Sequence, residues 1–357
     1  MPVSGTVSWT VLDDDGATIE PVEAYLAYLA ALERSPNTQR AYATSLKFWF
    51  EFLGRAGVGW SDVGVNNVAQ FVAWLRAPAD NVVVLESGSA LRLPATINRH
   101  LAAVFGFYEH HARLGVEVAA ELVAWRRVGR GVYKPFLHHV TKGRPVPTRP
   151  IKLVVPKVAP RVLSSEDLVA IVSAPERARD RFLFALLAGT GMRIGQALGL
   201  RHSDFVSRDK EAWIVPRGDN ANGARAKLRT TAVVPLTAGL VRLYSDYMHT
   251  EYGDVDSDYV FVNLWGGRIG APLSYTTLEK LVCRVRSQTG VAFNLHMLRH
   301  THATELIRSG VAIDVVARLL THTSTTTTSQ IYVHLSVDDT RAALQRAGVW
   351  PEAEAGQ

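Results

Sequence analysis

Cysteine is nearly absent from this chain of 357 residues, which contains only Cys283. A single cysteine forms no disulfide within the chain and builds no cysteine-based zinc site. Long apolar runs are also missing, since the run FLFALLAG at 182–189 is far too short to span a bilayer. The first residues lack the basic and apolar regions of a secretory signal. We therefore expect a cytoplasmic protein with no membrane partner.

Acidic residues are absent between positions 122 and 165, whereas the same stretch holds ten Lys and Arg and six Pro. Proline at this density prevents a continuous helix and predicts an extended basic linker. The charge excess, with a net charge of +6 for the chain, favours contact with phosphates; a solvated interdomain linker is the alternative. The candidate DNA contacts are Lys134, Lys142, Arg144 and Arg149 in this stretch, and Arg40, Lys47 and Arg99 before it.

Apolar residues at helical spacing fill positions 20–130. A helix-start cluster, SPNT at 35–38, precedes a face with Tyr42, Leu46, Trp49 and Leu53. A second face runs through Ile97, Leu101, Val104, Phe105 and Tyr108. The pattern predicts a helical domain over 20–130, after an N-terminal extension (1–19) and before a basic Pro-rich linker (131–160).

A second domain is expected over 161–357. Ser164 or Ser165 begins it as a helix cap, with acidic residues in the first turn. Two β-branched segments, 211–218 and 229–237, predict short strands, and helical patterns occupy the rest. We therefore predict a mainly α fold with a small antiparallel β-sheet and two domains.

The segment AGTGMRIGQALGL at 188–200 has the glycine spacing of a dinucleotide site, but it lies within a helical pattern and no βαβ unit follows. No P-loop spelling occurs. Arg193 stands among apolar neighbours in this segment, and a buried arginine needs an anion. Asp204 could supply it from within the protein, and a phosphate could supply it from outside.

His296 and Arg299 lie three positions apart, so they share one face of a predicted helix. His322 and Tyr332 follow shortly after. Two arginine forks with imidazoles and a phenol beside them would form a phosphoryl-transfer site without metal. A metal site is disfavoured, because no Glu stands between His296 and His300 and two arginines repel a cation.

Four segments together resemble the signature blocks of the tyrosine recombinases, or phage integrases: TGMRIGQALGLRHSD, KLRTTAVVPL, HMLRHTHAT and LLTHTSTTTTSQIYVHL. They span 190–335. The SPNTQRAYATSLKFWFEFL segment at 35–53 resembles the helical core-binding domain of that family. The chain length, the VLDDDG segment and the YKPFLHH segment are similar to the recombinase-type transposases of some resistance transposons. The resemblance implies a two-domain clamp on duplex DNA.

The resemblance assigns the catalytic positions. They are Arg193, Lys227, His296, Arg299, His322 and the nucleophile Tyr332, with Arg225 and Arg229 as rivals of Lys227. Tyr332 would leave a 3′-phosphotyrosine and a free 5′-hydroxyl, so no metal, ATP or other cofactor is implied. Family members work as tetramers, which implies a homotetramer on paired sites. The helix expected after Tyr332 would dock either on its own domain or on a neighbouring subunit.

Three departures from the family pattern stand out. Gln196 replaces the usual acidic residue three positions after the first arginine, and Thr321 replaces the commoner glycine of the third block. The interval from His322 to Tyr332 is ten residues, where nine is frequent. Other interpretations are a catalytically silent DNA-binding regulator on the same fold, a type IB topoisomerase-like enzyme and, more remotely, a metal-dependent nuclease.

Overall fold

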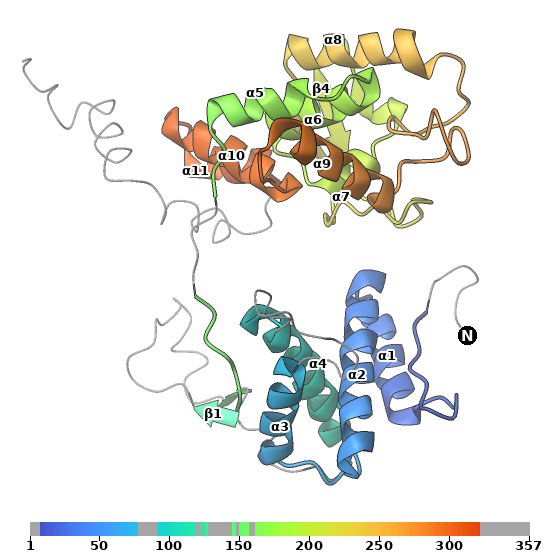
Figure 1. Ribbon diagram of the computed structural model, residues 1–357, viewed down its shortest axis with the longest axis vertical. Coiled ribbons are helices and arrows are strands. Elements are labelled where there is room, and N and C mark those ends of the chain that lie inside the picture. Colours follow the sequence, from blue (N-terminus) through green and yellow to red (C-terminus); the bar gives the residue numbers. More distant parts are fainter. Residues whose placement is uncertain are drawn as a thin grey trace, which may run out of the picture. The chain divides into compact units, whose positions relative to one another are not determined.

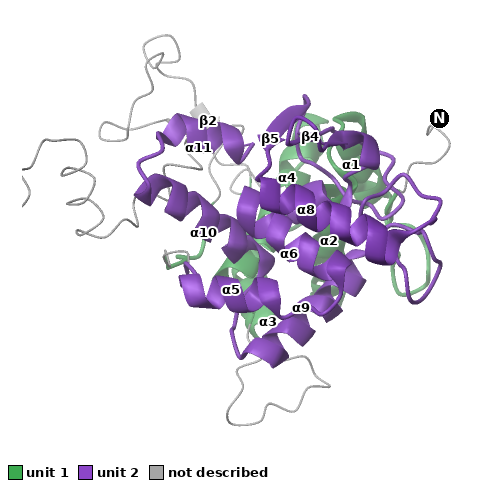
Figure 2. Cartoon of the chain, turned by 90° about the horizontal axis from the view of Figure 1, so that it is seen from above, with its two compact units in different colours: residues 1–157 green, residues 158–357 purple. Residues whose placement is uncertain are grey.

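The computed structural model describes residues 8–77, 92–118, 122, 125–127, 145–147, 150–156 and 161–321. The chain divides into two compact units, residues 1–157 and residues 158–357 (Figure 2). In the described part of the chain, no helix is both long and apolar enough to cross a membrane.

The first unit is helical (Figure 1). Its helices are α1 (Glu20–Ala31), α2 (Pro36–Ala56), α3 (Val65–Arg76) and α4 (Pro94–Arg113). Two short strands, β1 (Trp125–Arg127) and β2 (Pro145–Pro147), pair antiparallel in the same unit. One strand, β2, therefore lies within the predicted 131–160 linker, and its partner β1 precedes that linker.

Local sequence signals set the bounds of α2. The hydroxyl of Ser35 accepts the backbone N–H of Thr38 at 3.2 Å, and Pro36 occupies the first helical position, where no N–H donor is needed. Gly57 ends the helix with a φ of 64°, which a residue without a side chain adopts at no steric cost.

The core of the first unit lies between α1, α2, α3 and α4. Trp49 is fully buried and its indole N–H donates to the hydroxyl of Tyr108 at 3.0 Å, while that hydroxyl donates to the carbonyl of Trp60. Every residue of the predicted α4 face is buried: Ile97, Leu101, Val104, Phe105 and Tyr108. The helical prediction for this region is confirmed.

Part of the predicted 131–160 linker is held to α4. The side-chain amide of Asn98 donates to the carbonyl of Leu153 at 2.9 Å, and its oxygen accepts the Leu153 N–H at 2.8 Å. Ile151 and Leu153 pack against the core of the first unit. The boundaries that the sequence suggests for the domains stay a prediction.

The second unit combines helices with one small sheet. Its helices are α5 (Ser165–Ser173), α6 (Ala178–Thr190), α7 (Ile194–Leu198), α8 (Ala238–Tyr247), α9 (Tyr275–Thr289), α10 (Leu295–Arg308) and α11 (Ile313–Leu319), with a 3₁₀ turn η2 (His202–Asp204) and a π-helix η3 (Met248–Tyr252). Strands β3 (Phe205–Val206), β4 (Glu211–Ile214) and β5 (Ala232–Pro235) form an antiparallel sheet in that order. The predicted mainly helical fold with a small antiparallel sheet is confirmed.

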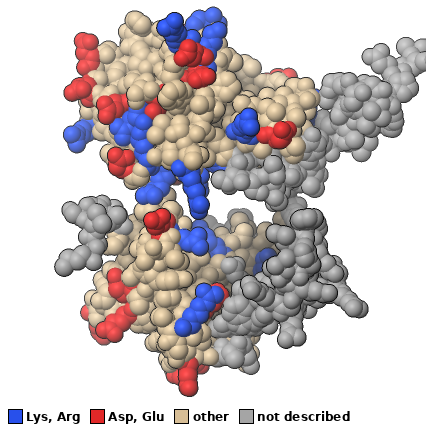
Figure 3. All heavy atoms as spheres, turned by 180° about the vertical axis from the view of Figure 1, so that it is seen from behind, with Lys and Arg blue, Asp and Glu red and all other residues tan. Residues whose placement is uncertain are grey.

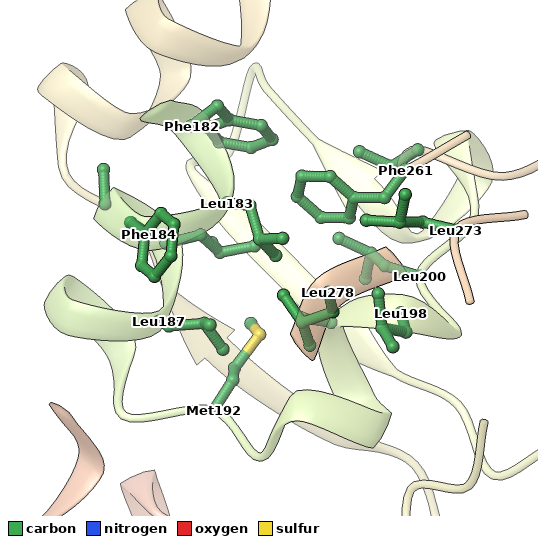
Figure 4. Close-up of a cluster of buried hydrophobic side chains, with 14 of the residues drawn as sticks. Phe182, Leu183, Phe184, Leu187, Met192, Leu198, Leu200, Phe261, Leu273 and Leu278 are labelled. Atoms are coloured by element: carbon green, nitrogen blue, oxygen red, sulfur yellow. The ribbon is translucent and has the colours of Figure 1, made fainter. Parts of the chain in front are cut away.

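Helix α6 is the centre of the second unit. It packs against α5, α8 and α10, and its residues from Phe182 to Leu187 are all buried. Burial of each such side chain stabilises the fold by about 1.5–3 kcal/mol. Figure 4 shows Met192, just after this helix, among the same apolar side chains as Leu187 and Leu278. The packing of Met192 therefore fixes the backbone next to Arg193.

Candidate active site

Arg193 stands at the first turn of α7, between two glycines that the fold requires. Gly191 ends α6 with a φ of 63°, and a Cβ there would lie 2.7 Å from Leu320 and 2.9 Å from the ring of His302. A Cβ on Gly195 would lie 2.5 Å from the Arg225 carbonyl oxygen. Side chains therefore approach the chain closely at Gly191, and the Arg225 backbone approaches it at Gly195.

The guanidinium of Arg193 is half-buried and binds the end of α11. Its Nη1 donates to the hydroxyl of Thr321 at 2.9 Å and to the Thr321 carbonyl at 3.2 Å. Burial lowers the pKa of Arg193. Asp204, the internal partner suggested by the sequence, instead takes a bidentate ion pair from Arg217 at 2.6 and 2.7 Å. The expectation of an Arg193–Asp204 pair is wrong because the sheet places Arg217 against that carboxylate.

Arg299 projects from α10 into the same place. It is buried, and it donates to the carbonyl of Gly191 at 2.7 Å and to that of Leu320 at 2.5 Å. Arg193 Nη1 lies 3.5 Å from the same Leu320 oxygen, so the two guanidiniums converge on one carbonyl. Burial, then the charge of Arg193, lowers the pKa of Arg299 to about 9.

The two converging guanidiniums lack an ion-pair partner in the described part of the chain, where every recorded salt bridge joins other residues. Their described acceptors are carbonyl and hydroxyl oxygens, which satisfy the N–H groups without neutralising the charge. Two adjacent cations held in this way form a site for a dianion or a phosphodiester.

His296 lies one turn before Arg299 on α10 and is exposed. Partial burial lowers its pKa, and the charges of Arg299, Arg193 and Lys227 add to the effect. The shift favours the neutral imidazole, which can accept a proton. Its ring also contacts that of His300, with centroids 4.4 Å apart at 81°.

Lys227 lies in the connection between β4 and β5, exposed, with a φ of 54°. The residue before it, Ala226, accepts a hydrogen bond from the side-chain nitrogen of Gln196 at 3.3 Å, which holds this loop to α7. The charge of Lys227 adds to the lowering of the His296 pKa. Two further contacts position the connection between β4 and β5 that carries Lys227. The Arg225 backbone passes close to Gly195, and it hydrogen-bonds the hydroxyl of Tyr275.

The structure thus brings the guanidiniums of Arg193 and Arg299 together at one carbonyl, with His296 one turn before Arg299 on α10 and the Lys227 loop held to α7 through Ala226. The catalytic roles of these four residues stay a prediction. His322 and Tyr332 lie outside the described residues. Sequence reasoning missed the supporting roles of Gly191, Gly195 and Leu320. The unusual density of glycine around Arg193 was the available signal, because close backbone approach is a common reason for glycine in a helical segment.

The candidate DNA contacts of the first unit are exposed but not gathered. Arg40 and Lys47 lie two turns apart on α2, and Arg40 stacks over Trp9 at 5.1 Å. Arg99 lies on α4. Figure 3 shows charges of both signs on this face of the molecule, with Lys and Arg side chains gathered along one edge of the second unit. The remaining candidates, Lys134, Lys142, Arg144 and Arg149, lie outside the described residues.

Among residues that the structure describes, no cluster of three or more His, Cys, Asp or Glu side chains could hold a metal ion. The acceptors around Arg193 and Arg299 are neutral oxygens, and the cations at this point disfavour a second positive charge.

Sequence comparison assigns both units to one family. Residues 161–338 match the phage integrase family, and residues 22–114 match the phage integrase N-terminal SAM-like domain. Transposase A from transposon Tn554 of Staphylococcus aureus is 40% identical over 333 residues, 93% of this chain and 91% of that protein. The chain therefore belongs to the phage integrase family, the tyrosine recombinases.

Further relatives agree with this assignment. Tyrosine recombinase XerD of Mycobacterium leprae is 31% identical over 338 residues, 93% of this chain and 97% of that one. The Tn1549 transposon integrase, solved with transposon right end DNA, shares the fold with a TM-score of 0.59 at 14% identity, covering 92% of this chain and 99% of that one. The predicted resemblance to transposon-encoded recombinases is confirmed by the Tn554 relative.

Proposed function

We propose that this protein cuts and rejoins duplex DNA at specific sites to move a mobile element, without metal or ATP. The observation that carries the proposal is the pair of buried, converging guanidiniums of Arg193 and Arg299, which have no carboxylate among the described residues. A phosphodiester supplies the missing anion. Likeness to Tn554 transposase A and to the Tn1549 integrase supports transposition as the biological setting.

In the proposed reaction the phenol oxygen of Tyr332 attacks the DNA phosphorus. An O–P bond to Tyr332 forms, the P–O5′ bond breaks, and the phenol passes its proton to the neutral imidazole of His296. Arg193 and Arg299 bind the non-bridging oxygens and stabilise the charge that develops there, each contributing about 3–4 kcal/mol. The leaving 5′-oxygen takes a proton from Lys227, whose exposed position on a loop lets it reach the DNA.

His296 has a lowered pKa, so it is available as a neutral acid/base group beside the phosphate. His322 donates a hydrogen bond to the same phosphate. A 5′-hydroxyl from the second duplex then attacks the phosphotyrosine, and the steps reverse. The phosphotyrosine conserves the bond energy, so ATP and metal have no role in the chemistry.

Exchange between two duplexes breaks four strands, and each broken strand is held by one tyrosine. A homotetramer on paired sites supplies these four nucleophiles. The first unit, with Arg40, Lys47 and Arg99, and the basic stretch at 131–160 hold the duplex, while the second unit carries out the chemistry. The two units together form a clamp, and a protein bound to DNA in this way resides with the nucleoid.

The test is covalent trapping on a nicked suicide duplex drawn from DNA beside the gene, with EDTA present. The wild-type chain is expected to form a protein–DNA adduct that Tyr332→Phe abolishes. Tyr28→Phe is the matched control, because Tyr28 is an exposed tyrosine of the first unit, and it should retain the adduct.

Each of three other results would contradict the proposal and support a different conclusion. An adduct that persists in Tyr332→Phe assigns the nucleophile elsewhere. DNA binding without any adduct indicates a regulator. Relaxation of supercoiled DNA without exchange between two duplexes indicates a topoisomerase-like enzyme.

A further inference from the structure

Thr321 has a backbone conformation that its side chain disfavours. It follows α11 with a φ of 54°, in the left-handed region where glycine is at ease and a β-branched residue is an outlier. Its side chain is nevertheless buried, with 7% of its surface exposed. Such strain persists only where the surroundings fix the residue, and it often marks a functional position.

The hydroxyl of Thr321 accepts two hydrogen bonds in this conformation. Nη1 of Arg193 donates at 2.9 Å, and Nε2 of Gln196 donates at 2.8 Å. A glycine would remove the strain and also remove this acceptor. The position therefore retains a costly residue whose hydroxyl contacts an arginine of the proposed phosphate site.

Gln196 completes the arrangement with both ends of its amide. Its oxygen accepts the backbone N–H of Arg193 at 2.7 Å, and its nitrogen donates to Thr321 and, at 3.3 Å, to the carbonyl of Ala226. Ala226 directly precedes Lys227. A carboxylate at position 196 could not donate to that carbonyl, so the amide suits this environment better than the acid usual in the family.

We propose that Thr321 and Gln196 are an uncharged positioning pair for Arg193. Thr321 holds the guanidinium through its hydroxyl and carbonyl oxygens, and Gln196 holds the Arg193 backbone N–H and the Thr321 hydroxyl. These groups are uncharged, so the positive charge of Arg193 remains available to the DNA. The pair also ties the start of α7 to the end of α11 and to the loop that carries Lys227. This inference rests on the proposed strand-transfer function and identifies residues that serve it without touching the DNA.

The alternative is that Thr321 has only a structural role at the end of α11 and does not position Arg193. The two ideas predict opposite effects for Thr321→Gly. A residue that is merely structural should give a variant that is equally or more stable and equally active. A positioning residue should give a variant that stays folded but reacts about 10- to 100-fold more slowly, the range expected for losing a hydrogen bond to a charged group.

The experiment measures the single-turnover rate of adduct formation on the nicked duplex at saturating protein, with DNA affinity and thermal stability measured separately. Thr321→Ser, which keeps the hydroxyl, is expected to react within about threefold of wild type, while Thr321→Gly slows 10- to 100-fold at unchanged affinity. Lys210→Gly is the matched control, because Lys210 has a φ of 55° in the same unit. It relieves the same kind of strain and should leave the rate unchanged.

A double-mutant cycle tests the pairing itself. Gln196→Ala and Thr321→Gly should each slow the reaction, and together they should slow it by less than the product of the two effects, because both break one network. Effects that multiply would overturn the pairing.

Thr321→Gly reacting at the wild-type rate, or Thr321→Ser reacting as slowly as Thr321→Gly, would overturn the positioning role while the proposed function stands. A wild-type chain that forms no adduct would overturn both.

Discussion

Replacing Arg299 by glutamine removes a buried cation that lacks a carboxylate partner in the described structure. Burial, then the charge of Arg193, lowers its pKa to about 9, well below the ordinary arginine value. The charged form is therefore penalised in the folded chain at every pH below 9, and the penalty fades only as the pH rises further. At about 1.4 kcal/mol per pH unit, the charge costs the folded chain about 5 kcal/mol at neutral pH.

The same substitution leaves two carbonyl oxygens with weakened partners. Arg299 donates to Gly191 at 2.7 Å and to Leu320 at 2.5 Å. Each buried acceptor left unsatisfied costs about 1–3 kcal/mol. The loss of these hydrogen bonds therefore offsets most of the stability gained by removing the buried charge. The free energy of unfolding of Arg299→Gln should lie between about 1 kcal/mol below and about 3 kcal/mol above that of wild type.

Arg179 is a matched comparison in the same unit. It is also buried, but it pairs with the buried carboxylate of Asp180 at 2.6 Å. Breaking such a pair costs about 3–5 kcal/mol. Urea unfolding should therefore separate Arg179→Gln from Arg299→Gln, whereas adduct formation should fall about 10²–10³-fold only in Arg299→Gln.

The reasoning fails if Arg299→Gln loses as much stability as Arg179→Gln. That result would mean that an acidic group of the protein neutralises Arg299, and the need for an external phosphate would disappear.

Three further predictions follow from the structure. Gly195→Ala should lower the free energy of unfolding by about 1–3 kcal/mol in urea melts, because its Cβ would press on the Arg225 carbonyl; an unchanged melt would contradict the close approach. NMR titration should give His296 a pKa below the ordinary histidine value, and Lys227→Met should raise it; no change would separate Lys227 from the site. Burial lowers the pKa of His100 from 6.5 to about 4, so stability should fall as the pH drops through that window, by about 3 kcal/mol in total, and His100→Gln should remove the dependence.

The sequence predicted which residues would carry the chemistry but not which residues hold them in place. Helical spacing was sufficient to place His296 and Arg299 on one face of a helix, because that relation is local. The partner of Arg193 was not predictable in the same way. Both Asp204 and Thr321 were present in the sequence, but only the fold decides that Arg217 occupies the first and leaves Arg193 to the second.

The role of Gln196 shows the same limit. The sequence displays an amide where an acid is usual, and the interpretation was a hydrogen bond in place of an ion pair. Only the structure adds that its nitrogen reaches both Thr321 and Ala226, which are 125 and 30 positions away. Long-range hydrogen bonds of this kind depend on tertiary packing, so no local pattern encodes them.

The hydrogen bond between Arg193 and Thr321 joins positions 128 residues apart, and Thr321 stands close to the end of the catalytic unit. During synthesis, Arg193 is therefore made long before its partner exists. The anion site takes shape only after α10 and α11 have been translated and have packed. A chain that ends before residue 321 contains the first unit and most of the core of the second unit. It lacks the arrangement of Arg193 and Thr321 that would bind a phosphate for cleavage. We therefore expect a chain that ends before residue 321 to lack both this anion site and the proposed nucleophile Tyr332, so it should not cleave DNA.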